Sequence, residues 1–134
     1  MEKRFDISKY VDYFHDGCLF NILKKKDAVA FKISSSEVDP LDIEKDVILS
    51  KNHRIRGVLH LENIQNISLT GGYQLENLFD MFNLGTILDF EIQNEVVEFG
   101  ILWENAPPKP RTNEFTTTII KASRIWWENI PEMS

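Results

Sequence analysis

The feature that most constrains this chain is the alternation of apolar and polar residues through residues 87–103. In 87–93, Leu88, Phe90 and Ile92 alternate with the other side chains, and in 96–103 the alternating set is Val97, Phe99, Ile101 and Trp103. Side chains with a period of two point to opposite faces of a β-strand. The two residues between these runs, Asn94 and Glu95, suit a tight turn because Asn tolerates positive φ. The sequence therefore predicts an antiparallel hairpin here.

Further strands are predicted on both sides of this hairpin. Residues 19–23 and 29–33 favour strands and are joined by a short polar connection, which indicates a second antiparallel hairpin. Residues 55–61 alternate as well, and the irregular apolar spacing after them predicts a bend or bulge near Gln65-Asn66. Residues 115–122 form a last strand, and residues 124–131 either extend it or begin a helical turn.

Short helices are predicted at two places only. Residues 8–15 suit one helical turn with Ser8 as its cap, and residues 74–82 carry an apolar stripe at helical spacing. Three prolines make residues 105–113 a loop. We therefore expect a mainly β protein, an antiparallel β-sandwich or barrel-like domain with one or two short helices. The predicted core consists of Phe31, Ile33, Leu59, Leu61, Phe90, Ile92, Phe99 and Ile101.

The length and composition indicate one globular domain spanning residues 1–134. Apolar residues make up 43% and charged residues 27% of the chain, which are ordinary globular values. Cys18 is the only cysteine, so an intrachain disulfide is impossible and nothing points to an oxidising compartment. The N-terminus lacks the apolar stretch of a signal peptide, and no apolar run is long enough for a membrane span. We therefore expect a cytoplasmic protein without a membrane partner.

The charge argues against a nucleic-acid partner. The chain has a formal net charge of -6, and nucleic-acid binding depends on neutralising phosphates with cations. The longest basic run, Lys24-Lys25-Lys26, lies beside Asp27 and is interpreted as a solvated hairpin end. The same negative charge suits a basic protein partner.

No recognisable catalytic, cofactor or metal motif is present. His15, His53 and His60 lack ligand spacing, so we expect no common metal site and no cofactor. Cys18 begins an apolar strand and is interpreted as a small core residue. Ser34-Ser35-Ser36 lacks a glycine elbow, and Asp39-Pro40-Leu41-Asp42 lacks the central glycine of a calcium loop. No catalytic residue is assigned.

The tryptophans are the best candidate contact residues. Trp126 and Trp127 are adjacent, so in a strand they face opposite sides, and only one can enter the core. We expect Ile125, one of these two tryptophans and Ile130 to anchor the C-terminal segment. Trp103 lies at a strand end beside the proline-rich loop. An exposed Trp suits a binding surface, so Trp103, Trp126 and Trp127 are the predicted binding residues.

Two short stretches carry a resemblance. Phe14-His15-Asp16-Gly17 leads into a predicted hairpin, and Ile125-Trp126-Trp127-Glu128-Asn129-Ile130-Pro131 closes the chain. Together they resemble small bacterial β-rich families of unknown function, some of which are grouped with the immunity proteins that neutralise polymorphic toxins. The resemblance implies a non-enzymatic protein of the bacterial cytosol that binds a partner, as an immunity protein or inhibitor does. Two alternatives stay open: a β-sandwich that binds a carbohydrate or small ligand through exposed Trp, and an enzyme whose site the sequence does not reveal.

Overall fold

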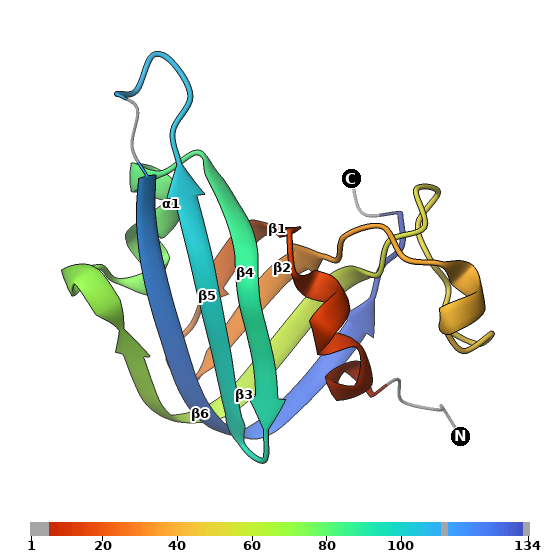
Figure 1. The fold of residues 1–134 in the computed structure, drawn as a ribbon. Helices are drawn as coiled ribbons and strands as arrows, with labels where there is room; N and C mark the ends of the chain where they lie inside the picture. The colour runs from red at the N-terminus through yellow and green to blue at the C-terminus, as the bar shows by residue number, and fades with distance from the viewer. Residues whose placement is uncertain (1–5, 111–112, 133–134) are drawn as a thin grey trace.

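The chain forms a closed barrel of antiparallel strands. A computed structural model describes residues 6–110 and 113–132, and within these ranges the strands follow the order β1-β2-β3-β6-β5-β4 around the barrel (Figure 1). Their bounds are Gly17–Lys24 (β1), Ala28–Ser34 (β2), Arg56–Leu69 (β3), Leu84–Gln93 (β4), Val96–Glu104 (β5) and Asn113–Asn129 (β6). The mainly β, antiparallel fold is therefore confirmed. Of the two predicted architectures, the structure shows the barrel and not the two-sheet sandwich.

Both predicted hairpins are present. Gln93 of β4 pairs with Val96 of β5, and Asn94 between them has a φ of 56°. A two-residue turn needs this left-handed backbone, which Asn adopts at little cost. In the β1–β2 hairpin, the Lys25 N–H donates to the Ala28 carbonyl at 2.8 Å. Local sequence therefore determines both turns.

The last strand continues through most of residues 124–131, which confirms the first of the two predicted alternatives for this segment. β6 pairs with β5 through Asn113–Lys121 and with β3 through Thr118–Asn129. Its partner β3 has a register shift between Ile64 and Asn66, which confirms the predicted bulge near Gln65-Asn66. The first part of β6 pairs with β5 and the later part pairs with β3. β6 therefore links β4 and β5 to the β1–β2–β3 side of the barrel.

The barrel closes through a short contact, and a 3₁₀ helix lies beside it. β1 and β4 share only three residue pairs, which end at Gly17 and Ile87. η1 (Ile7–Phe14) packs against β4 and buries three side chains in the core: Ile7, Tyr10 and Phe14. Its N-cap is Asp6 and not the predicted Ser8, because the Asp6 carboxylate accepts the Ser8 N–H at 3.1 Å.

The remaining helical segments are short. They are η2 (Pro40–Asp42), η3 (Thr70–Gly72), η4 (Leu75–Asn77) and α1 (Leu78–Met81). η4 and α1 together occupy the predicted helix at 74–82, and the predicted apolar stripe buries Leu75, Leu78 and Phe82. None of the helices in the described part of the chain has the length and apolar character needed to cross a membrane.

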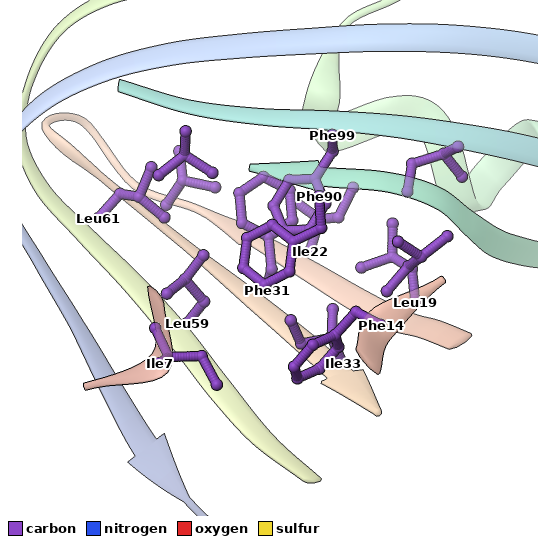
Figure 2. Packing of buried hydrophobic residues seen from close by; sticks show 14 of the residues in the cluster. Ile7, Phe14, Leu19, Ile22, Phe31, Ile33, Leu59, Leu61, Phe90 and Phe99 are labelled. Atoms are coloured by element: carbon purple, nitrogen blue, oxygen red, sulfur yellow. The ribbon is translucent and has the colours of Figure 1, made fainter. Parts of the chain in front are cut away.

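Aromatic side chains dominate the barrel interior. Phe90 stacks on Phe99 with 4.6 Å between ring centroids, and Phe31 lies 4.8 Å from Phe99 (Figure 2). Seven of the eight predicted core residues are buried, whereas Ile92 is only partly buried at the edge of the cluster. Ile92 lies one residue before the end of β4, close to the β4–β5 turn, where the barrel wall ends.

Candidate functional site

Trp103 lies inside the barrel, which contradicts its predicted role as an exposed contact residue. Its side chain is 0% exposed, and its Nε1–H donates to the Thr116 hydroxyl at 2.8 Å. The rings of Phe79 and Phe82 pack against it from the α1 region, at centroid distances of 5.1 and 5.4 Å. The alternation of β5 already places Trp103 on the inner face with Phe99. Its position beside a loop is no guide to exposure, because the α1 region covers this end of the barrel.

The adjacent tryptophans point to opposite faces, as predicted. Trp127 faces the core with 7% of its surface exposed, and its ring lies 6.0 Å from that of Phe14. Trp126 is half-buried and stacks on His60, with a centroid distance of 4.0 Å and an interplanar angle of 9°. The contact between the Phe14 and Trp127 rings joins the end of η1 to the end of β6.

The rest of the closing segment is less deeply buried than predicted. Ile125 packs against the core but is only half-buried. Ile130 is also half-buried, and its N–H donates to the Arg56 carbonyl at 2.8 Å. A hollow of about 270 Å³ lies over this segment, and Asp6, Ile7, Ser8, Ile92, Asn94, Ile125, Trp126 and Trp127 line it. His60 stacks on Trp126, and the Arg124 guanidinium lies 5.5 Å from the centroid of the Trp126 ring, so this ring already has two partners within its own chain.

The three histidines lie on separate elements. The exposed His15 donates its Nδ1–H to the Leu88 carbonyl at 2.7 Å, and this hydrogen bond, with the nearby Asp16 carboxylate, raises the pKa of His15 above its usual value. His53 lies in a turn with a φ of 56°. His60 donates through Nε2 to Glu128 at 2.9 Å. Within residues 6–110 and 113–132, no group of three His, Cys, Asp or Glu side chains is arranged to hold a metal ion.

Carboxylates gather instead on the β4–β5 hairpin. A simple sequence signal, which none of the predictions above uses, marks this region: residues 57–108 contain eight acidic residues and no Lys or Arg. Five of these acidic residues belong to the hairpin: Asp89, Glu91, Glu95, Glu98 and Glu104. Glu91 and Glu98 lie directly opposite each other on the outer face. Neither forms an ion pair in the described structure.

Three neighbouring hollows surround the end of this hairpin. One of about 250 Å³ lies between η1 and β4 and is lined by Val11, Asp12, His15, Leu88, Asp89, Phe90 and Glu91. A second of about 300 Å³ is lined by Glu91, Gln93, Asn94, Val96, Glu98 and Ile119. The third is the hollow over Trp126. Glu91 lines both the first and the second hollow, and Asn94 lines both the second and the third, so the three hollows are neighbours. We call the carboxylates of this region the acidic hairpin surface: Asp6, Asp12, Asp89, Glu91, Glu95 and Glu98.

Apolar side chains border the acidic hairpin surface on β6. Phe115 is 50% exposed and Ile119 is 39% exposed, and Ile119 lies opposite Glu98 in register. The absence of a side chain at Gly100 leaves room for Phe115 and Asp89, because a Cβ there would lie 3.0 Å from the Phe115 ring and 2.9 Å from the Asp89 carboxylate. A long basic side chain can thus lay its methylenes on apolar residues and its charge between Glu91 and Glu98.

The second hollow therefore has the chemistry to receive a lysine or arginine from another molecule. Comparison with known proteins adds no assignment to this geometry: no protein-family model, curated protein or solved structure matches the chain.

Proposed function

We propose that the protein is a non-enzymatic binding protein, of the immunity-protein or inhibitor kind, whose acidic hairpin surface binds a basic protein partner in a bacterial cytosol. The observation that carries this proposal is the direct opposition of Glu91 and Glu98 on two strands that contain no Lys or Arg. The nearest cation on the same face, Lys121 of β6, lies opposite Val96, and no ion pair joins it to either glutamate in the described residues. Like charges placed directly opposite each other destabilise an antiparallel pair. A partner that supplies the missing cation turns this unfavourable pair into a favourable contact.

The distribution of charge supports the same proposal. All Lys and Arg residues lie outside 57–108, so the β4–β5 hairpin carries five acidic residues and no cation of its own, which makes the outer face of this hairpin strongly negative. A concentrated field accelerates the encounter with an oppositely charged protein and disfavours partners of the same charge. This behaviour suits an inhibitor that must find a toxic basic protein quickly.

The carbohydrate alternative receives less support from the same geometry. Of the three tryptophans on which it depends, Trp103 and Trp127 are buried and Trp126 stacks on His60. The acidic hairpin surface also offers carboxylates rather than an exposed aromatic platform. We therefore place the contact surface on β4, β5 and η1 instead of on the tryptophans.

The test uses the protein encoded by the gene next to that of this chain, which the proposal expects to be basic. We expect its toxicity in a bacterial host to be suppressed when the two are co-expressed, and the purified proteins to associate more slowly as salt is raised. The double variant Glu91→Gln/Glu98→Gln should lose most of this rate enhancement.

The matched control removes the same charge elsewhere. Glu76 and Asp80 are exposed acidic residues in the η4–α1 region, so Glu76→Gln/Asp80→Asn changes the net charge equally without touching the acidic hairpin surface. Binding by this control should stay close to that of the wild type. Equal effects of the two double variants, or no binding of the neighbouring protein by the wild type, would refute the proposed function.

A further inference from the structure

The segment that joins β2 to β3, residues 35–55, projects from the side of the barrel as a long, ordered loop, coloured orange to yellow (Figure 1). Hydrogen bonds hold its two arms together: the Ser35 N–H donates to the Ile55 carbonyl and the Val38 N–H to the His53 carbonyl, both at 2.9 Å. Val38 and Ile43 are buried beneath it. Connections this long are uncommon in small domains and are often functional.

Two large apolar side chains of this loop point into solvent. Leu41 is 92% exposed and Ile48 is 66% exposed. Leu41 lies in η2, where Pro40 begins the turn and the Asp39 carboxylate accepts the Leu41 N–H at 3.0 Å. The Ile48 carbonyl accepts a hydrogen bond from the Asn129 side chain at 2.8 Å. Both backbones are thus held in place while both side chains remain outside, so the fold gains almost nothing from them.

The surroundings of Leu41 have the same charge as the acidic hairpin surface. One lysine and five exposed acidic residues occupy residues 37–46, and the acidic ones are Glu37, Asp39, Asp42, Glu44 and Asp46. A partner that covers Leu41 must therefore present positive charge around an apolar socket. This is the same class of partner that the acidic hairpin surface selects.

η1 connects the two regions. On one side, Glu44 of the loop approaches Lys9 of η1 at 3.8 Å, and the Ser36 N–H donates to the Tyr13 carbonyl at 3.0 Å. On the other side, Asp12 of η1 lines the same hollow as Glu91. A single partner lying across η1 can thus contact both the loop and the acidic hairpin surface.

We propose that Leu41, assisted by Ile48, is the apolar anchor of the interface with the basic partner and inserts into an apolar socket rimmed by that partner's cations. This inference rests on the proposed function and adds a second contact region to it. Charge complementarity mainly sets the association rate, whereas a desolvated apolar anchor mainly sets the lifetime of a complex. The two regions therefore predict two separable kinetic effects.

The experiment compares Leu41→Ser and Leu41→Ser/Ile48→Ser with the wild type, using the purified protein of the neighbouring gene as the binding partner. Thermal melts come first and should show unchanged stability, since Leu41 makes almost no contact with its own chain. Binding kinetics should then show dissociation about tenfold to hundredfold faster, the equivalent of losing one buried leucine. The association rate and its salt dependence should stay the same.

Leu23→Ser is the matched control. Leu23 is 49% exposed on β1, next to the basic run Lys24-Lys25-Lys26, where a basic partner is repelled. Its loss should leave dissociation unchanged. If Leu41→Ser dissociates no faster than Leu23→Ser while Glu91→Gln/Glu98→Gln still slows association, the anchor is refuted and the proposed function stands. If neither the loop nor the glutamate variants affect binding, both proposals fail.

Discussion

Glu91 of β4 and Glu98 of β5 are directly paired across the antiparallel strands, and neither has a cationic neighbour that forms an ion pair with it in the described residues. A protein selected for stability alone has no reason to keep this pair, because opposed like charges cost free energy. Functional surfaces are where such a cost is commonly found. The pair therefore leads to a prediction in which stability and binding change in opposite directions.

Replacing Glu98 with Gln should stabilise the free protein and weaken partner binding. Removing the repulsion should raise the free energy of unfolding by about 0.2–1 kcal/mol, as cross-strand pairs typically contribute. Urea denaturation measures the change. Glu104→Gln is the control, since Glu104 lies opposite Leu84 and has no opposed carboxylate. A Glu98→Gln protein that is no more stable than Glu104→Gln would contradict the argument.

Truncation of the two adjacent tryptophans should have unequal effects. Trp127→Ala removes a buried ring from the contact with Phe14 and should cost about 3–5 kcal/mol of stability. Trp126→Ala removes a half-buried ring and its stacking on His60, so it should cost clearly less. Denaturant melts of both single variants decide this, and equal losses would show that the inward position of Trp127 does not anchor the segment.

The hydrogen bond between Trp103 and Thr116 should appear as a coupling between the two residues. Thr116→Val leaves the indole N–H buried without its acceptor, which should cost about 1–3 kcal/mol. Trp103→Phe alone removes the donor and leaves the threonine hydroxyl buried. The double variant should therefore be less destabilised than the two single losses together. Strict additivity in a double-mutant cycle would show that the bond contributes nothing specific.

His15 should make the stability depend on pH. Its Nδ1–H donates to the Leu88 carbonyl and the Asp16 carboxylate lies nearby, and both raise the pKa of His15 in the folded state. The pKa of His15 in the folded state lies above its unfolded value of about 6.5, so the protonated ring stabilises the folded protein. This contribution to the free energy of unfolding is complete below about pH 6.5 and is lost as the pH rises through the folded pKa. Unfolding measured across this range should show the decline, and His15→Gln should flatten it.

Two measurements check the assignment to His15. His53→Gln, at an exposed turn, is the control: if it flattens the pH profile as much as His15→Gln does, the dependence does not come from His15. An NMR titration of the His15 ring should give a pKa above about 6.5. A value at or below this number would mean that the contact with Leu88 does not stabilise the charged ring.

Local features of this protein follow from the sequence alone. The β4–β5 hairpin is set by alternation on both sides of Asn94, whose positive φ needs no distant contact. The same alternation puts Trp126 and Trp127 on opposite faces and places Trp103 on the same face of β5 as Phe99. The run without cations from residue 57 to 108 is also visible in the sequence, although the function of that run depends on where its side chains point.

Contacts between residues far apart in the sequence determine how the barrel closes and which side chains it buries. The barrel closes where Gly17 meets Ile87, and no local pattern specifies a pairing between strands so far apart in sequence. The inward position of Trp127 follows from its pairing with Leu59 of β3, while Trp126 falls opposite His60. The cover over Trp103 comes from the α1 region, and η1 brings Asp12 beside Glu91. Alternation determines which side chains share a face, but only the assembly of the whole barrel determines which face is buried and which charges become neighbours.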